Sequence, residues 1–378
     1  MKILQCVPYY LPYHGGQESY VHNLSKSLIQ RGHEVDVITS DYPAVRGMDE
    51  IDGVQIFRHR CLARPLRNPL TPGFFHLTRE YKDYDLVHTH NEHSTAAIAT
   101  SLGRMFNDLP VLLTCHGRLI FGDHIRDRLE RLYSLTIGWS IFARADGIVV
   151  NSVDDRAYVL SIHPHAMDKM FVVHNAVDPR QLDAVPEEPP AGMPSSGFIL
   201  LYVGRLIRRK GLEWLIRAMA TIKKTDPTTD LRCILVGEGE DQDYFTELIR
   251  ELGVSDSVFL MGAVTQAELV YLYRHADLFV LPSLSEVCPT VVLEAMYFGL
   301  PVITTDIPGV RDHFSCCASL VPPRDEQALA EAILTVSGDH ALSQRLSRIG
   351  QNLVRTKYTW ETVSKNYESI YQKVVNGK

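Results

Sequence analysis

Residues 198–224 read FILLYVGRLIRRKGLEWLIRAMATIKK, which passes from an apolar run through a short basic loop into an amphipathic pattern. An apolar run of this kind is typical of a strand in a parallel sheet that helices cover on both faces. Gly204 and Gly211 bound the loop, and leucine and isoleucine then recur at helical spacing. The stretch therefore predicts a strand, a loop and a helix in succession.

The same succession recurs along the chain. Strand-like runs are KILQCV, EVDVIT, DLVHTH, VLLTCH and GIVVNS in the first half, and CILVGEG, SVFLMG, LFVLPS and PVITTD in the second. Helical patterns lie between them, for example at residues 20–32 and 243–253. Strands that alternate with helices favour an α/β fold built on doubly wound parallel sheets.

One break in this pattern predicts two domains. Residues 186–197, PEEPPAGMPSSG, hold four prolines and two glycines, which neither a helix nor a central strand tolerates. We therefore expect Rossmann-like domains at 1–185 and 197–356, and a separate helix within 357–378. A chain of 378 residues is long enough for two hydrophobic cores.

Composition excludes several classes of protein. No apolar run reaches the roughly 18–20 residues that a membrane-spanning helix needs, and the first residues resemble a buried strand more than a signal peptide. The net charge of −7 argues against nucleic-acid binding through a basic surface. Seven cysteines without a CxxC pair are typical of reduced thiols, so we expect a cytoplasmic protein.

Two cations follow the strand at residues 198–203. Arg205 comes directly after it, and Lys210 lies just before the next helix. Open α/β sheets bind ligands at the carboxyl ends of their strands, and these cations are suited to phosphate oxygens. A solvated basic loop is the alternative.

The run PSLSEVCPTVVLEAMYFGLPVITTD at residues 282–306 carries two glutamates eight positions apart. Glu286 would lie in a strand-end loop, and Glu294 about two turns into the following helix. The first amides of that helix, at Thr290 and Val291, would be free to bind a phosphate. A carboxylate among apolar side chains is unfavourable unless it is paired or contacts a ligand. Glu294 could therefore accept hydrogen bonds from two neighbouring sugar hydroxyls. Two unrelated glutamates are the alternative.

The first half offers weaker signals. Gly15 and Gly16 stand between a strand and a helix, where backbone amides could approach an anion, although a tight turn alone would also need glycine. His116 ends the run VLLTCH at a strand end and is a candidate catalytic residue, although a lone histidine is more often structural.

Two patterns resemble metal sites. Asp83 and Asp85 have the Asp-x-Asp form, but they lead into an apolar strand, which favours a surface turn. His88, His90 and His93 lack a further evident ligand. We predict no metal site.

Residues 53–79 contain no acidic residue. Five arginines lie within them, and these could contact an anionic membrane surface or a phosphorylated acceptor: Arg58, Arg60, Arg64, Arg67 and Arg79. A solvated loop is the alternative.

Together these motifs resemble the retaining glycosyltransferases of family 4, the group 1 glycosyltransferases, which have the GT-B fold. The resemblance covers almost the whole chain and includes the Gly-Gly loop, LTCHG, ADGIVVNS, NAVD, VGRLIRRKG, LVGEGE, FLMGAV and the final run EAMYFGLPVITTD. It implies two Rossmann-like domains facing a cleft, with the C-terminal helix crossing back to the first.

The resemblance also implies roles for residues in the second domain. Arg205 and Lys210 match the pair that binds the diphosphate of a nucleoside-diphosphate sugar. Glu294 matches the carboxylate on the ribose hydroxyls, and Glu286 the residue that contacts the donor sugar and its developing charge.

Further matches concern the edges of the donor site. Thr290 and Val291 match the amides near the phosphates, and Ala263 and Val264 match the segment that reads the base. In the first domain, His116 matches the histidine next to the transferred sugar, and Gly15 and Gly16 the loop over the diphosphate. The chain departs from many members by having VCPTVVL, with Pro289, where they have a Phe-Gly pair.

We therefore expect a metal-independent transferase that moves a sugar, with retention of configuration, from a nucleotide sugar to a glycan or lipid-linked acceptor. It would need no cofactor and would bind no nucleic acid. The alternatives are a nucleotide-sugar 2-epimerase of the same fold and a non-catalytic sugar-nucleotide sensor.

Overall fold

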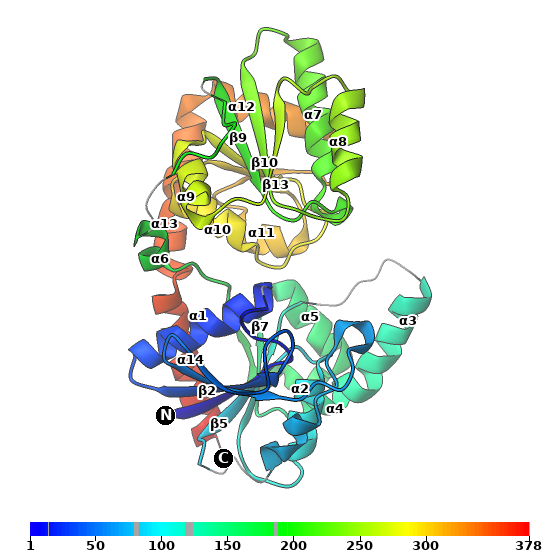
Figure 1. Cartoon of the computed structure of the whole chain (residues 1–378), viewed down its shortest axis with the longest axis vertical. Coiled ribbons are helices and arrows are strands. Elements are labelled where there is room, and N and C mark those ends of the chain that lie inside the picture. Colours follow the sequence, from blue (N-terminus) through cyan, green and yellow to red (C-terminus); the bar gives the residue numbers. More distant parts are fainter. Residues whose placement is uncertain (14, 79–82, 118–123, 185–187, 195, 378) are drawn as a thin grey trace. The chain divides into compact units, whose positions relative to one another are not determined.

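A computed structural model describes residues 1–13, 15–78, 83–117, 124–184, 188–194 and 196–377. Its contacts divide the chain into two compact units (Figure 1). The first contains Met1–Asn175 and Trp360–Lys378, and the second contains Ala176–Thr359. The division falls before the proline-rich segment, so that helix α6 (Pro179–Ala184) belongs to the second unit.

The first unit is built on an eight-stranded sheet in the order β3-β4-β2-β1-β5-β6-β7-β8. Its strands and helices are β1 (Lys2–Cys6), α1 (Gly16–Gln30), β2 (Glu34–Ser40), β3 (Gly47–Ile51), β4 (Val54–His59), β5 (Leu86–His90), α2 (Thr95–Gly103), β6 (Val111–Cys115), α3 (His124–Tyr133), α4 (Trp139–Arg144), β7 (Gly147–Val150), α5 (Val153–Ile162), β8 (Met170–Val172) and α14 (Trp360–Asn376). Every strand pair is parallel except β3 with β4.

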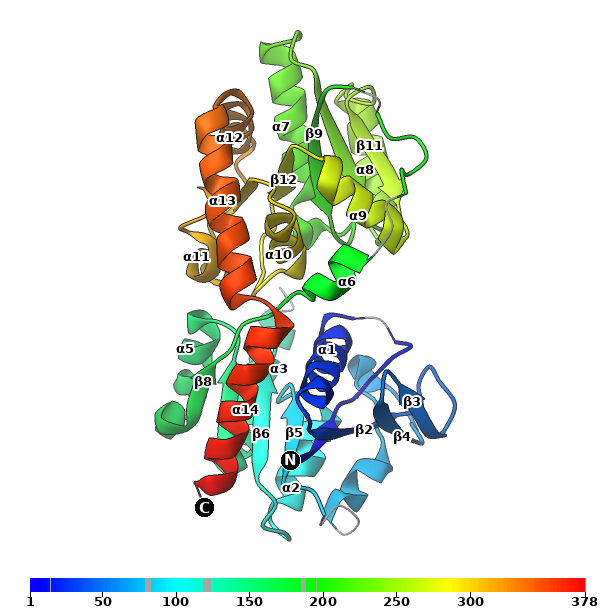
Figure 2. The ribbon, with the colours of Figure 1, turned by 90° about the vertical axis from the view of Figure 1, so that its left-hand side faces the viewer.

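Helices cover both faces of this sheet, and its central strands β5, β6 and β7 are buried along their whole length. Helices α1 and α14 pack against each other, and α14 also contacts β6 (Figure 2). On that face His88 of β5 bonds to Tyr371 of α14. On the opposite face Leu4 and Val87 pack with residues of α2. The alternation of side chains along β5 thus sends its histidines towards α1 and α14.

The second unit contains a six-stranded, wholly parallel sheet in the order β11-β10-β9-β12-β13-β14. Its other elements are β9 (Phe198–Val203), α7 (Leu212–Thr225), β10 (Leu231–Val236), α8 (Gln242–Glu251), β11 (Val258–Gly262), α9 (Gln266–His275), β12 (Leu278–Leu281), α10 (Thr290–Tyr297), β13 (Val302–Thr305), α11 (Pro308–Phe314), β14 (Ser319–Val321), α12 (Glu326–Gly338) and α13 (His340–Lys357). Helix α7 contacts α8 and α12, and α9 and α10 pack on the central strands. The predicted α/β fold with parallel sheets is confirmed.

The order of strands reverses once in the second unit. From β9 the chain runs outward through β10 and β11, then returns to β12 on the other side of β9. The loops that follow β9 and β12 therefore leave neighbouring strands in a sheet of this topology, which is where such sheets bind ligands.

The prediction that Arg58 contacts a membrane surface is wrong. Val54–His59 is a strand, not a loop, and its residues are alternately buried and half-buried. Arg58 falls on the buried side, with 3% of its surface exposed, and donates hydrogen bonds to the carbonyl oxygen of Leu11 and to Asp49. It therefore cannot contact a membrane.

Gly211 is required where the loop after β9 enters α7. Its φ is +69°, and a Cβ there would lie 1.9 Å from the carbonyl oxygen of Pro282. No side chain can be accommodated at that distance, so the loops after β9 and β12 pack backbone against backbone.

We predict that Gly211→Ala lowers the free energy of unfolding by roughly 3–4 kcal/mol, the sum of a left-handed conformation and an overpacked contact. Gly253→Ala is the matched control, because Gly253 has φ +67° but open space around it. It should cost only about 1–2 kcal/mol. Urea unfolding of both variants measures the difference, and equal losses would contradict the close approach.

Candidate functional site

An ion pair joins the two loops at the reversal point of the second unit. Lys210, in the turn Arg208–Lys210 after β9, places Nζ 2.6 Å from Oε1 of Glu286, which follows β12. The two side chains are only 18% and 12% exposed. Two of the predicted site residues are thus brought together.

Neighbouring contacts hold this pair in place. The hydroxyl of Ser283 donates to the same oxygen of Glu286 at 2.5 Å. The amide of Leu284 donates to the carbonyl oxygen of Arg209 at 2.9 Å, which links the loops through their backbones. Gly211 is next in sequence to Lys210, so the tight packing at Pro282 also positions the ammonium group.

Arg205 lies at the beginning of the loop that follows β9, in a different environment from Lys210. Its side chain is exposed, and within the described residues no ion pair of its guanidinium is found. Its carbonyl oxygen accepts a hydrogen bond from the hydroxyl of Tyr202 at 3.0 Å, which fixes the backbone there. Arg205 is therefore a cation held at the strand end by its main chain.

Glu294 is half-buried and lies just over one turn into α10, not the two turns that the sequence suggested. Burial raises the pKa of its carboxyl group to about 7, and a hydrogen bond from the hydroxyl of Tyr273 to Oε2, 2.8 Å long, opposes this rise. Tyr273 in turn stacks on Phe298, with ring centroids 5.6 Å apart. A carboxyl group with a raised pKa is thus held by the hydroxyl of a buried tyrosine.

Helix α10 begins at Thr290, and Pro289 is its N-cap. The carbonyl oxygen of Pro289 accepts from the amides of Val292 and Leu293 at 3.1 and 3.4 Å. In the described part of the chain the amides of Thr290 and Val291 have no such acceptor, as expected for the first positions of a helix. Because the backbone nitrogen of a proline carries no hydrogen, the N-cap itself offers no donor.

Ala263 and Val264 form the turn between β11 and α9. Strand β11 is separated from β9 by β10, so this turn lies two strands from the Lys210 loop. Helix α9 begins with a capping box, in which Thr265 and Glu268 each accept the amide hydrogen of the other. At 263 and 264 the polar atoms are those of the backbone, because the side chains of alanine and valine are apolar.

The first unit contains a chain of three hydrogen-bonded side chains. Oε1 of Gln5 in β1 is 2.7 Å from Nε2 of His90, and Nδ1 of His90 is 3.0 Å from Nε2 of His116. Gln5 and His90 are fully buried, and His116 is half-buried. The ring of Tyr20, from α1, meets His116 edge-on at 5.0 Å.

This chain sets the proton positions on His116. With the carbonyl oxygen of Gln5 as acceptor, His90 donates through Nε2, and its Nδ1 then accepts from Nε2–H of His116. Burial lowers the pKa of His116 to about 4, so the ring is neutral at pH 7. Its Nδ1 is therefore an unprotonated acceptor, suited to a ligand hydroxyl.

Sequence reasoning missed the partners of these predicted residues. The signal for His90 was present in the alternation of His88 and His90, which places both on one strand face. Gln5 and Tyr273 come from other strands and helices and carry no local pattern. Only the pairing of elements reveals them.

Gly15 and Gly16 lie at the start of α1, as predicted. A Cβ at Gly15 would meet Oε2 of Glu18 at 2.3 Å, so a carboxylate already occupies the space beside the helix start. Burial raises the pKa of Glu18. An anion approaching these amides would have to displace that side chain.

The histidines that resemble a metal site point to different partners. His88 bonds to Tyr371 and Thr114, whereas His93 lies 3.4 Å from both Glu92 and Glu130. Across the described ranges no group of His, Cys, Asp and Glu is arranged to hold a metal ion.

The remaining arginines of the 53–79 stretch differ from Arg58. Arg60 and Arg64 are exposed, and the guanidinium of Arg64 lies 3.5 Å from the ring centroid of Tyr42. The side chain of Arg67 and the whole of Arg79 lie outside the described residues. A pocket of about 330 Å³ is lined by Tyr42, Cys61 and Arg64.

Two family models match the chain. The model described as Glycosyltransferase Family 4 matches residues 14–181, and the model described as Glycosyl transferases group 1 matches residues 187–353. The chain belongs to the group 1 glycosyltransferases. Among its relatives is an uncharacterised glycosyltransferase of Methanocaldococcus jannaschii, 28% identical over 95% of this chain and 94% of that protein.

Other relatives of this glycosyltransferase carry specific names. The glycogen synthase of Mycobacterium tuberculosis is 27% identical, over 96% of this chain and 92% of its own length. The sucrose-phosphate synthase of Thermosynechococcus elongatus has a similar structure, with a TM-score of 0.78, 24% identity and coverage of 100% and 99% of the two chains. These likenesses confirm the GT-B fold.

We predict that Glu294→Gln changes the pH dependence of stability in this glycosyltransferase. The unfolded chain loses the Glu294 proton near the ordinary value of 4.5, whereas the native state keeps it until about pH 7. Rising pH therefore lowers the free energy of unfolding of the parent through this group, but not that of the variant. The difference between them should change in favour of the variant by at most about 1.4 kcal/mol per pH unit across that window. Urea unfolding between pH 4 and 8 measures the gap, and a gap independent of pH would refute the raised pKa.

Proposed function

We propose that the second unit binds a nucleoside-diphosphate sugar and that the enzyme transfers the sugar to an acceptor hydroxyl with retention of configuration. The observation that carries this proposal is the Lys210–Glu286 pair at the reversal point, with Arg205 and the start of α10 on the same strand-end loops. Cations and free amides suit a diphosphate. A carboxylate beside them suits the attached sugar.

The ion pair supports an exchange of partners when the donor binds. A diphosphate would compete with Glu286 for the ammonium of Lys210, which is 2.6 Å away in the free protein. Once displaced, the carboxylate of Glu286 would be available to sugar hydroxyls and to positive charge that develops on the ring. Lys210 and Arg205 would then stabilise the leaving diphosphate.

Glu294 would accept the two ribose hydroxyls of the donor. Its carboxyl group is half-buried, and Tyr273 holds Oε2, so Oε1 would be directed at the ligand. Such a contact is equal in the ground and transition states, so it should affect KM more than kcat.

The first unit would bind the acceptor, with His116 beside the transferred sugar. Its neutral ring would accept a hydroxyl hydrogen through Nδ1. In the reaction the bond between the sugar carbon and the diphosphate oxygen breaks, and a bond to the acceptor oxygen forms on the same face. The acceptor proton passes to the departing phosphate oxygen, as the family resemblance implies.

Named relatives support a nucleotide donor without identifying it. An Anabaena protein of this fold, HepE, has been solved with UDP and with UDP-glucose, and starch synthase IV of Arabidopsis thaliana with ADP and acarbose. The base, the sugar and the acceptor of the present enzyme are therefore to be found by screening.

We predict that Arg205→Ala and Lys210→Ala each weaken nucleoside-diphosphate binding and slow transfer. The free energy of the transition state should rise by about 2–4 kcal/mol, the usual effect of losing one charge-stabilising group. Arg208→Ala is the control from the same loop, because its guanidinium lies 3.7 Å from the Tyr244 ring centroid and 3.5 Å from Asp241. Calorimetric titration with UDP, GDP and ADP measures binding. Unchanged affinity in both test variants would remove the diphosphate site.

We also predict that transfer from a donor found by thermal-shift screening continues in EDTA, because protein groups meet the phosphate charge. Mass spectrometry of the products distinguishes transfer from 2-epimerisation, which yields a free isomeric nucleotide sugar, and from binding without turnover. Loss of activity in EDTA, restored by Mg²⁺ or Mn²⁺, would show that the reaction needs a metal.

A further inference from the structure

Helix α3 has its apolar side outward, the reverse of an ordinary surface helix. Five large apolar side chains recur at intervals of four, three, three and four positions through α3, the π-helical segment Ser134–Gly138 and the start of α4. Their exposed fractions are 72% for Ile125, 61% for Leu129, 61% for Leu132, 48% for Leu135 and 47% for Trp139. We call these five residues the outer stripe.

The inner side of the same helix is polar. Glu130 is 6% exposed, and its Oε1 accepts hydrogen bonds from Ser134 and Tyr158 at 2.8 and 2.9 Å. The hydroxyl of Tyr133 donates to the carbonyl oxygen of Glu92 at 3.0 Å. Polar bonds therefore fix which side faces inward, so the helix cannot rotate to bury the outer stripe without breaking them.

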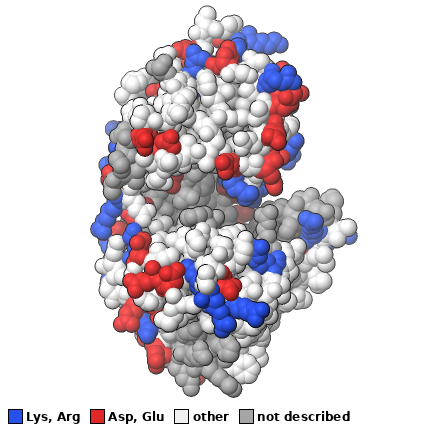
Figure 3. Space-filling view, in the orientation of Figure 1, with Lys and Arg blue, Asp and Glu red and all other residues white. Residues whose placement is uncertain are grey.

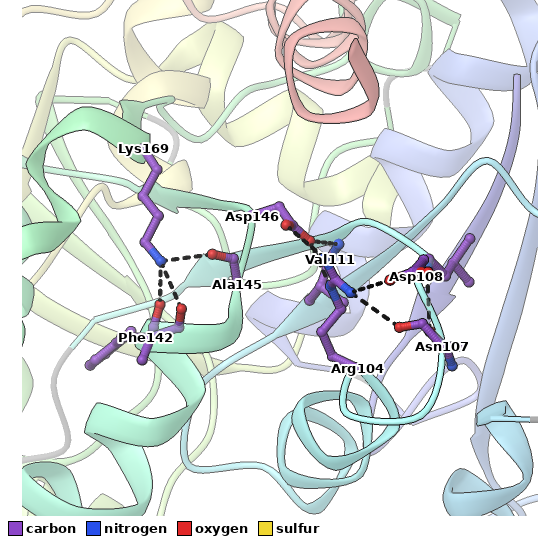
Figure 4. A network of polar contacts seen from close by, with 10 residues as sticks. Arg104, Asn107, Asp108, Val111, Phe142, Ala145, Asp146 and Lys169 are labelled. Atoms are coloured by element: carbon purple, nitrogen blue, oxygen red, sulfur yellow. Dashed lines mark hydrogen bonds and ion pairs between the residues drawn. The ribbon is translucent and has the colours of Figure 1, made fainter. Parts of the chain in front are cut away.

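The end of α4 is tied down as well. The ammonium of Lys169 donates to the carbonyl oxygens of Phe142, Ala143 and Ala145 at 2.8, 3.1 and 2.8 Å (Figure 4). These include the last carbonyls of the helix, which a cation stabilises. In the same view Arg104 binds both carboxylate oxygens of Asp146, just beyond α4. The segment that carries the outer stripe is thus held firmly at this end.

Basic side chains flank the outer stripe. Arg126, Arg128 and Arg131 are all exposed, whereas the acidic residues of α3 are half-buried Asp127 and buried Glu130. Figure 3 shows Lys and Arg atoms beside uncharged surface at the right-hand end of the first unit, where Figure 1 labels α3. An exposed apolar stripe with cations alongside is typical of helices that lie in the headgroup region of a membrane.

We propose that the outer stripe of α3 and α4 docks this enzyme onto an anionic lipid bilayer. The apolar side chains would enter the boundary between headgroups and acyl chains, and the arginines would pair with lipid phosphates. Every helix in the described ranges is too short or too polar to span a bilayer, so the contact would lie on the surface. This inference goes beyond sugar transfer and does not depend on which donor is used.

The outer stripe fits a membrane better than the 53–79 stretch does. In that stretch Arg58 is buried, and Arg64 covers the ring of Tyr42. Leu62 and Leu66 are 60% and 92% exposed there, which makes them a chemically matched comparison for Leu129 and Leu132.

The test is co-sedimentation of the full chain with vesicles of phosphatidylcholine alone or of an equal mixture of phosphatidylcholine and phosphatidylglycerol. Binding should need the anionic lipid and fall with salt. Leu129→Ser with Leu132→Ser should weaken it at least about tenfold, and each of Arg128→Ser and Arg131→Ser roughly fivefold. The pair Leu62→Ser with Leu66→Ser should bind as the parent does.

Circular dichroism and the thermal shift with nucleoside diphosphates should be unchanged in all of these variants, so a lost membrane contact is distinguishable from a lost donor site. Equal partition of parent and Leu129/Leu132 variant would overturn the proposal. So would binding lost only in the Leu62/Leu66 pair, or a dimer of the free parent that the Leu129/Leu132 change dissociates.

Discussion

The arrangement of the second unit depends on one close approach of two backbones. Gly211 passes the carbonyl oxygen of Pro282 at a distance that no Cβ could accept, so the loops after β9 and β12 meet directly. Because those strands are neighbours at the point where the sheet order reverses, the contact places Lys210 beside Glu286. The position of both charged groups thus follows from a constraint on a residue that carries no side chain.

The sequence predicted the parts of this arrangement that depend on local pattern. Apolar runs followed by amphipathic segments gave the strands and helices, and strand-end placement singled out Lys210 and Glu286. Their pairing was not predicted, because it depends on which strands are neighbours. Tyr273 could not be found for a similar reason: it reaches Glu294 from α9, and only packing brings the two helices together.

The prediction that Arg58 could contact a membrane was wrong because it considered only the charge of residues 53–79 and not their alternating pattern. The alternation within Val54–His59 is that of a strand, and it turns Arg58 inward to Asp49 and a carbonyl oxygen. In α3 the opposite holds, since leucines face outward and a glutamate faces inward. In both elements burial of individual side chains, which depends on tertiary neighbours, decided what the charges can contact.

The salt link between Lys210 and Glu286 has a consequence for selectivity. In the protein without a ligand, Lys210 and Glu286 neutralise each other. A simple anion such as inorganic phosphate could bind Lys210 only by leaving the carboxylate of Glu286 without a partner, which costs free energy. A ligand with an anion at one end and hydroxyl groups at the other could compensate both halves of the broken pair. The salt link would therefore weaken the binding of simple ions more than that of molecules with both an anion and hydroxyl groups. The affinity for the latter would also be somewhat lower than without the link.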